Sequence, residues 1–263
     1  MKQVFFLSLM MFAICLTPAF AQQYNVVGYG DYFIEGVAIG FTDTNPDIRG
    51  LSLNPATGNI LISERYGQIA VINPSNGSTI KFINNAGTGD DTIPLFRVKT
   101  SSDGQIYTAG YGGSVKRVGT ESVTDAAASP IVIGPESYSS TGFCRGLYVT
   151  GSYAAGTVRI ISCRGTLVHI WQQSGASSDA FTIAQTINTS AAGLDAESHS
   201  YWARDDFSEV LVYRQQAGVG LRKFTGSIAS GYTWDSSYAG NIYLQWLYSI
   251  AVDPVRDILV SCN

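Results

Sequence analysis

The chain has 263 residues, of which 45% are hydrophobic and only 14% are charged, and its formal net charge is −4. An ordinary soluble domain has about 25% charged residues, and this chain has no basic run of the kind that binds nucleic acid or anionic membranes. Its 28 glycines and 15 tyrosines are typical of a β-rich extracellular protein, because turns need glycine and strands favour aromatic side chains.

The first 21 residues have the features of a secretory signal peptide. A short start with one lysine precedes the apolar run Val4–Phe20, and Ala19–Ala21 offers small residues at the two cleavage positions. We expect cleavage after residue 21 and a mature domain of residues 22–263 that is secreted or periplasmic. An uncleaved membrane anchor is the alternative, although the run is short for the ~20 residues of a span. No later segment reaches that length, so we expect no membrane contact after cleavage.

Residues 48–84 contain four short apolar runs, which read IRGLSLN, NILISER, QIAVIN and STIKFIN. The turn sequences Pro55–Gly58 and Pro74–Gly77 separate the first run from the second and the third from the fourth. Helical periodicity is nearly absent from the chain. Four antiparallel strands joined by tight turns in under forty residues have the size of one β-propeller blade.

Similar units begin near Leu95, Phe143, Ala191 and Leu247. We expect their second strands at intervals of about 50 residues, which is near the repeat length of propellers. The chain is therefore predicted to be all-β, a β-propeller of about five four-stranded blades. The second strands are expected to begin near Ile60, Ile106, Val158, Tyr201 and Ile258.

The last unit has only two predicted strands, and two apolar runs near the mature N-terminus, YNVVGYG and YFIEGVAIG, have no unit of their own. The N-terminal runs would complete the last blade and close the ring, which removes open sheet edges. Two alternatives remain open. The ring could be truncated, with further blades beyond Asn263, or the strands could form a β-sandwich.

Three cysteines remain after removal of the signal peptide, and export permits a disulfide. A hairpin symmetric about Tyr153–Ala154 would place Val149 opposite Val158 and Cys144 opposite Cys163. Directly opposed residues lie close enough for a bridge. We therefore expect a Cys144–Cys163 disulfide, with two buried free thiols as the alternative.

The segment RGLSLNPATGNILISERYGQIAVINPSNGSTIKF resembles the repeat of a family of secreted bacterial β-propellers of unassigned function. Arg49–Leu51 and Asn54–Asn59 carry this RGL-x-x-NPxTGN resemblance, which extends over about Ile48–Gly119. It implies a propeller fold and no particular activity. The chain is more distantly similar to calcium-dependent sugar lactonases, which are also propellers. In that resemblance Glu35 matches the first of the Glu, Asn and Asp metal ligands.

Three arginines, Arg49, Arg97 and Arg145, stand 48 residues apart, each near the start of the first strand of its unit. First strands line the central channel of a propeller, so the three guanidiniums are expected on one arc of that channel. Arginine binds carboxylate, phosphate or sulfate through a rigid fork of donors. The alternative is that each arginine pairs with a carboxylate and holds blades together. Such carboxylates could be Asp47, Asp91 or Asp195.

A second cluster contains Asp195, Glu197 and His199. On a strand these alternate residues project from one face. Two carboxylates and an imidazole could hold a divalent metal or act as acid and base. The segment could equally be a polar edge. The other histidine, His169, lies in an apolar run and is expected in the core.

The stretch GYTWDSSYAGNIYLQW contains Trp234 and Trp246 and is rich in turn residues. Exposed aromatic side chains on loops often bind ligands, so these two could stack on a sugar ring. Packing between blades is the alternative.

Two functions follow. The preferred one is a secreted, monomeric, non-catalytic binding or interaction propeller without a cofactor, which holds an anionic small molecule or a carbohydrate. The alternative is a metal-dependent, lactonase-like hydrolase with Ca²⁺. In that case Glu35, Asp195, Glu197 and His199 would supply the site. The metal content of the purified protein would distinguish the two.

Overall fold

The computed structural model describes residues 39–42, 47–89, 95, 97–110, 112–134, 146–164, 167–194, 199–214, 221–237, 249–253 and 258–262. These residues form eighteen strands and one 3-10 turn at Ser190–Ala192. No helix among them has the length and apolar character needed to cross a bilayer.

The strands form five antiparallel sheets, each of which follows the order of the sequence. Blade 1 contains β1 (Ile48–Leu53), β2 (Ile60–Glu64), β3 (Ile69–Ile72) and β4 (Thr79–Ile83). Blade 2 contains β5 (Arg97–Thr100), β6 (Ile106–Ala109), β7 (Val115–Gly119) and β8 (Ile131–Ile133). Blade 3 contains β9 (Tyr148–Thr150), β10 (Arg159–Arg164), β11 (Leu167–Gln173) and β12 (Phe181–Asn188). Blade 4 contains β13 (His199–Ala203), β14 (Glu209–Arg214), β15 (Leu221–Ser227) and β16 (Gly231–Trp234), and a two-stranded sheet contains β17 (Ser249–Asp253) and β18 (Ile258–Cys262).

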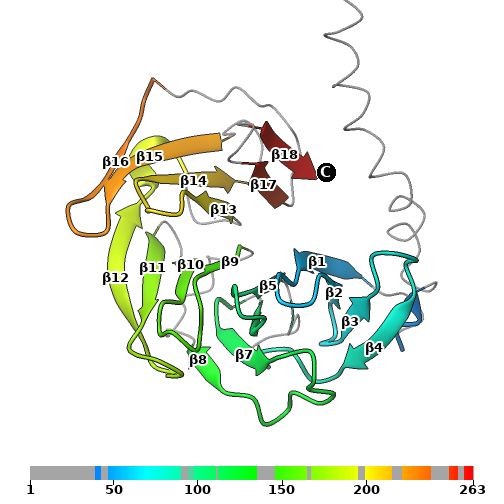
Figure 1. The fold of residues 1–263 in the computed structure, drawn as a ribbon. Helices are drawn as coiled ribbons and strands as arrows, with labels where there is room; N and C mark the ends of the chain where they lie inside the picture. Colours follow the sequence, from blue (N-terminus) through cyan, green and yellow to red (C-terminus); the bar gives the residue numbers. More distant parts are fainter. Residues whose placement is uncertain are drawn as a thin grey trace, which may run out of the picture.

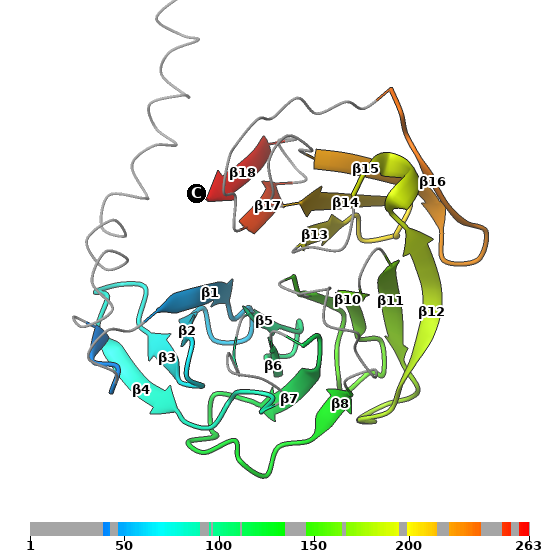
Figure 2. The ribbon, with the colours of Figure 1, turned by 180° about the vertical axis from the view of Figure 1, so that it is seen from behind.

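The sheets are arranged radially around a central axis (Figures 1 and 2). The first strands contact one another in order, β1 with β5, β5 with β9, β9 with β13, and β13 with β17. The fourth strands lie on the outside. This arrangement confirms the predicted all-β propeller.

The ring is not closed within the described residues, since β17 and β18 face β1 across an open gap (Figure 1). The structure contains four complete blades and one two-stranded sheet. The N-terminal runs predicted to close the ring are residues 24–30 and 32–40. Of these only Ile39 and Gly40 are described, and these two do not lie in a strand.

Apolar cores fill the spaces between neighbouring blades. Leu61 of blade 1 packs with Val98 and Ile106 of blade 2, and Tyr107 on the other face of blade 2 packs with Ile160 of blade 3. A middle strand is therefore covered on both faces, and β2 and β3 are buried along their whole length. Burial on both faces explains why these strands read as continuous apolar runs rather than as alternating ones.

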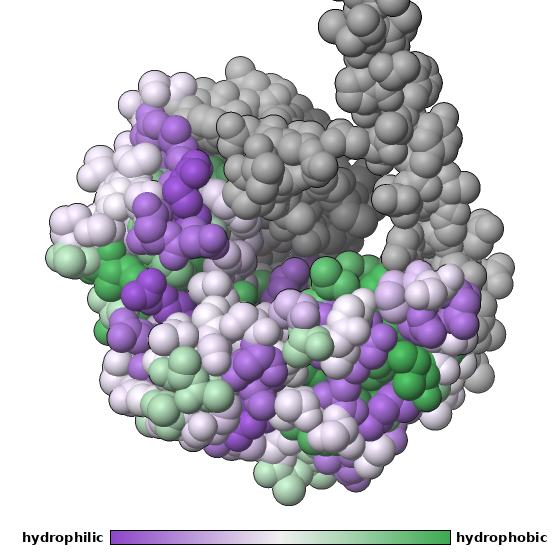
Figure 3. Space-filling view, viewed as in Figure 1, coloured by the Kyte–Doolittle hydropathy of each residue, from purple (hydrophilic) through white to green (hydrophobic). Residues whose placement is uncertain are grey.

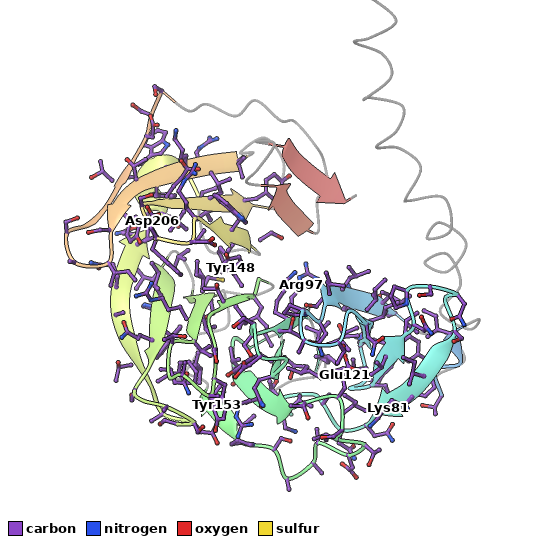
Figure 4. The ribbon with its side chains drawn as sticks, viewed as in Figure 1. Lys81, Arg97, Glu121, Tyr148, Tyr153 and Asp206 are labelled. Carbon is purple, nitrogen blue, oxygen red and sulfur yellow. The ribbon has the colours of Figure 1, made fainter. Side chains whose placement is uncertain are left out.

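The turn between the first two strands of blade 1 is bound to blade 2 through a single carboxylate. Glu121 accepts hydrogen bonds from Asn54 Nδ2 at 2.6 Å, Thr57 Oγ1 at 2.7 Å and Asn59 Nδ2 at 2.8 Å. Lys81 Nζ donates to the Glu121 carbonyl at 2.6 Å, and Figure 4 shows the two residues together where blades 1 and 2 meet. The polar residues of the NPxTGN motif thus hold two blades together.

The equivalent turn of blade 2 is also bound to the next blade, but here the carboxylate belongs to the turn itself and the donors lie between β9 and β10 of blade 3. Asp103 accepts hydrogen bonds from Ser152 Oγ at 3.0 Å, the Tyr153 amide at 3.1 Å and the Ala154 amide at 2.8 Å. Its own strand end contributes Ser101 Oγ at 2.6 Å. In both blades the turn between the first two strands is therefore bound to the next blade through hydrogen bonds to a carboxylate.

One of the second strands does not begin where the sequence predicted. Tyr201 lies in β13, the first strand of blade 4, and the second strand of that blade begins at Glu209. The prediction was wrong because it took SYWA as the second strand of the blade. SYWA and EVLVYR are both apolar runs, so the sequence did not show that the turn between them, Asp205–Asp206, joins the first strand to the second. The second strand of blade 3 begins at Arg159, one residue from the predicted Val158.

The register of the β9–β10 hairpin also differs from the prediction. Val149 pairs with Ile160, not with Val158, because the Thr157 amide donates to the Ser152 carbonyl and centres the turn one residue later than expected. Continuing that register brings Gly146 opposite Cys163, so the geometric argument for the disulfide does not hold. Cys163 is buried, and Cys144 lies outside the described residues.

Candidate functional site

The start of β1 is irregular at the RGL motif. The pairing with β2 shifts between Ile48 and Gly50, and the Arg49 side chain forms an ion pair with Asp47. A Cβ at Gly50 would lie 2.7 Å from Ser63 Oγ and 2.8 Å from the Val98 amide nitrogen. Glycine is therefore required here, because it lets β5 approach β1 closely.

Side chains of β5 bind the edge of β1 that no other described strand pairs. Arg97 as a residue is 8% exposed. Its guanidinium donates through Nη1 to the Arg49 carbonyl. Lys99 Nζ lies 3.4 Å from the Leu51 carbonyl, and Thr100 Oγ1 donates to the Leu53 carbonyl at 2.8 Å. Arg97 and Lys99 are two residues apart on one strand, so they leave it on the same face. Figure 4 shows Arg97 beside β1 at the inner end of the blades.

A further arginine joins this group from the turn after β2. The Arg65 amide donates to the Asp47 carbonyl at 2.9 Å, and Arg65 Nη1 lies 3.9 Å from Asp47 Oδ2. We call Arg49, Arg65, Arg97 and Lys99, with Asp47, the basic cluster. The structure thus brings two of the three predicted arginines together. Asp47 pairs with Arg49 from two residues away in the same blade, so this ion pair does not join two blades.

Sequence reasoning missed two members of the basic cluster. Lys99 could have been found, because the two-residue period of a strand puts it on the same face as Arg97. Arg65 had no such signal, because its position depends on how the turn after β2 folds back toward the start of β1.

The electrostatic potential at the basic cluster is positive, because the cluster has four cationic side chains and one carboxylate. Burial and the positive charge of Arg97 lower the pKa of Lys99 to about 8. An anion beside Lys99 would favour its charged form and raise that pKa. The arrangement can therefore hold the oxygen atoms of a carboxylate, phosphate or sulfate, for which guanidinium and ammonium groups are the usual partners.

The metal hypothesis concerns residues that the structure does not describe. Glu35, Asp195 and Glu197 lie outside the described residues, and so do Arg145 and Trp246. His199 begins β13, but its side chain is not described either. Within the described ranges, no three His, Cys, Asp or Glu side chains are grouped as a metal site.

The two remaining candidates lie in the body of the fold. Trp234 lies in β16 opposite Phe224 and packs, half-buried, on the core shared by blades 3 and 4. Its indole Nε1 is buried and has no hydrogen-bond partner, so Trp234 takes the packing role that was the alternative to sugar stacking. His169 is buried in β11, with Nδ1 2.9 Å from Thr186 Oγ1, as expected for a core residue.

Comparison with known proteins identifies the fold. No protein-family model matches the chain, and no curated protein matches its sequence. A chain of a mitotic checkpoint complex matches with a TM-score of 0.51 and 14% identity, over 81% of this chain and 59% of that one. The Cps50 (Swd1) β-propeller domain of Myceliophteria thermophila matches with a TM-score of 0.50 and 11% identity, over 81% of this chain and 65% of that one. The chain spans less than two thirds of either structure, and at these identities the similarity shows the propeller fold alone.

Proposed function

We propose that the protein is an exported, non-catalytic interaction propeller that holds an anionic group at the basic cluster. The fold supplies a rigid frame in which inner strands from successive blades meet at the axis. Ligands of such frames bind where several elements converge. The basic cluster is such a place, because β1, β5 and the turn after β2 each contribute a basic residue.

One observation carries this proposal, the convergence of Arg97 and Lys99 of β5 on the Arg49 and Leu51 carbonyls of β1, beside the Arg49 side chain. The pKa of Lys99 agrees with it. A lysine is protonated well above neutral pH in water, whereas burial and Arg97 hold the pKa of Lys99 at about 8. The protonated lysine beside Arg97 is therefore electrostatically unfavourable. Burial is the larger cause of the lowered pKa and does not by itself favour an anion. The smaller contribution of Arg97 does, because an anion beside Arg97 and Lys99 would offset the repulsion between their charges.

An anion suits the site better than a neutral sugar. Of the two aromatic residues expected to stack on a sugar, Trp234 contributes to the core between blades 3 and 4, and Trp246 lies outside the described residues. The lactonase-like function with Ca²⁺ remains an untested prediction, because its residues, Glu35, Asp195, Glu197 and His199, are not described with their side chains.

Anion titration of the purified mature protein tests the proposal. We would add inorganic phosphate, sulfate and citrate at low ionic strength and measure heat of binding and the shift in Tm, since a ligand that binds only the folded state raises Tm. Replacing Arg97→Ala removes a charge-assisted hydrogen bond of about 1.5–3 kcal/mol, which corresponds to roughly a 10- to 100-fold weaker affinity.

Arg204→Ala is the matched control, because Arg204 is an arginine of blade 4 that lies 3.8 Å from Glu209 and away from the basic cluster. It should leave anion affinity unchanged. Equal affinities for wild type and Arg97→Ala, or no binding of any of the three anions, would overturn the proposal.

A further inference from the structure

An exposed aromatic ring adjoins the basic cluster. Among the described aromatic residues Tyr66 alone is exposed, at 57%. It lies in the turn between β2 and β3, directly after Arg65 of the basic cluster. The guanidinium carbon of Arg65 is 5.5 Å from the centre of the Tyr66 ring. A ligand bound to Arg65 would therefore lie within reach of this ring.

The turn that carries Tyr66 is held by hydrogen bonds along its length. The buried Glu64 carboxylate accepts from the Tyr66 amide and from the Gln68 amide, each at 2.8 Å. Between these two residues, the Gly67 carbonyl accepts from the Ala86 amide at 2.8 Å. An aromatic ring presented by a fixed backbone loses little conformational entropy when it binds a ligand.

Arg65 has hydrogen-bond donors available beside that ring. Its Nη1 is 3.9 Å from Asp47 Oδ2, which is longer than a hydrogen bond. Within the described ranges the Arg65 side chain donates no hydrogen bond, and it is 33% exposed. A carboxylate beside Tyr66 would therefore bind Arg65 without displacing another acceptor.

Asp47 indicates that the ligand carries more than an acidic group. Its carboxylate, 36% exposed, lies between the guanidiniums of Arg49 and Arg65. A bare inorganic anion would be repelled by this carboxylate. Hydroxyl groups, in contrast, donate hydrogen bonds to carboxylates. A ligand that has both an acidic group and hydroxyl groups suits the three side chains together.

Apolar surface also lies close to the start of β1. Leu51 follows Arg49 by two residues and is 47% exposed, and Figure 3 shows hydrophobic surface over β1 at the edge of the gap. The surroundings of the basic cluster thus combine apolar and charged groups. A ligand with C–H groups as well as polar groups would contact both, whereas an inorganic anion would not.

We propose that the basic cluster and Tyr66 bind an acidic sugar, a pyranose ring that bears a carboxylate; this rests on the proposed anion site and names its ligand class. The carboxylate binds Arg65, the hydroxyl groups donate to Asp47, and one face of the sugar lies on the Tyr66 ring. The face of an aromatic ring is negative. It therefore attracts the C–H groups of a sugar, which carry partial positive charge, in preference to the face of another aromatic ring.

Calorimetric titration of the mature protein with matched ligands tests this ligand class. Methyl glucuronide, methyl glucoside and acetate, compared at equal ionic strength, separate the contribution of the sugar ring from that of its charge. We expect methyl glucuronide to bind about tenfold more tightly than either of the other two, because neither of them uses both Arg65 and Tyr66. In saturation-transfer NMR, the protons on one face of the glucuronide ring should receive most of the saturation.

Variants of Tyr66 separate the sugar from the anion. Tyr66→Ala should weaken methyl glucuronide binding about tenfold, the order expected when a stacking ring is removed, and should leave the phosphate affinity unchanged. Tyr66→Phe keeps the ring and should keep the affinity. Ile183→Ala is the matched control, since Ile183 is 44% exposed on β12 of another blade, and it should bind methyl glucuronide as wild type does.

Asp47→Asn gives a readout that does not depend on how much of the variant is folded. The ratio of the glucuronide affinity to the phosphate affinity is measured within the same protein sample. We expect this ratio to fall, because the substitution weakens the acceptor for the sugar hydroxyls and removes the charge that repels phosphate.

The outcomes distinguish this inference from the proposed function. If phosphate or citrate binds but methyl glucuronide binds no more tightly than acetate or methyl glucoside, the acidic sugar is overturned and the anion site stands. A Tyr66→Ala variant that binds methyl glucuronide as tightly as wild type has the same meaning. If neither the simple anions nor methyl glucuronide binds, both proposals are overturned.

Discussion

The carboxylate of Glu121 should contribute more to stability than its place in a surface turn suggests. It is the common acceptor for Asn54, Thr57 and Asn59, and it belongs to blade 2 while they belong to blade 1. Replacing Glu121→Ala removes all three hydrogen bonds and leaves the strands of both blades intact. We expect the contact between the two blades to weaken, with loss of the free energy of unfolding.

The three hydrogen bonds are unequal, and burial decides their contributions. Asn54 is 1% exposed, so its Nδ2 would lose its partner without gaining water, which costs about 1–3 kcal/mol. Thr57 is exposed and Asn59 partly exposed. Their donors can bind water instead, and each loss should cost about 0.5 kcal/mol. The total is about 3 kcal/mol, which corresponds to a fall in Tm of about 6–12 °C for a chain of this size.

Thermal unfolding followed by circular dichroism measures this effect. The double variant Asn54→Ala with Glu121→Ala should be less destabilised than the sum of the two single variants, because both remove the same hydrogen bond. Glu209→Ala is the control, since its pairing with Arg204 across 3.8 Å is half exposed and should contribute at most about 1 kcal/mol. A Tm for Glu121→Ala that equals the Tm of this control would refute the reasoning.

Two further predictions concern the contacts between blades. Gly50→Ala places a Cβ 2.8 Å from the Val98 amide nitrogen, so it should reduce the free energy of unfolding by about 1–3 kcal/mol through overpacking. Urea unfolding would detect this loss, and an unchanged urea midpoint would contradict the prediction. Burial raises the pKa of Asp103, but its hydrogen bonds from Ser101 and from residues 152–154 outweigh this and set it below the ordinary value. A lowered pKa stabilises the fold above the unfolded pKa of about 3.9 and loses that contribution as pH falls further. The Tm advantage of wild type over Asp103→Asn should therefore shrink below about pH 4 in a pH series of melting curves, and a constant difference would count against this linkage.

The fold was readable from the sequence because each blade is a local structure. Hydrogen-bonded neighbours within a blade are consecutive strands, so apolar runs and the turn residues between them were enough to place β1 to β4. Errors arose where the turns gave weak signals. The hairpin before Val158 is centred by a hydrogen bond between Ser152 and Thr157, and nothing in the composition of the loop distinguishes this from a turn one residue earlier.

The basic cluster was only partly predictable, for a different reason. The 48-residue spacing placed Arg49 and Arg97 on neighbouring inner strands, and both lie there. Whether an arginine meets a carboxylate or a carbonyl depends on distances between blades, which sequence spacing does not contain. Arg49 meets Asp47, whereas Arg97 binds the Arg49 carbonyl. The two arginines are also one position apart in their blades, because Arg97 pairs with Ala109 as Gly50 pairs with Ser63, and Arg49 lies in the irregularity before Gly50.

The side chains along the inner edge of β1 also bear on aggregation. A strand with an open row of carbonyl groups is a template for adding strands from other molecules, which is how fibrils grow. Here three of those carbonyl groups are already engaged by Arg97, Lys99 and Thr100. With these groups bound, β1 is a poor seed for fibril growth.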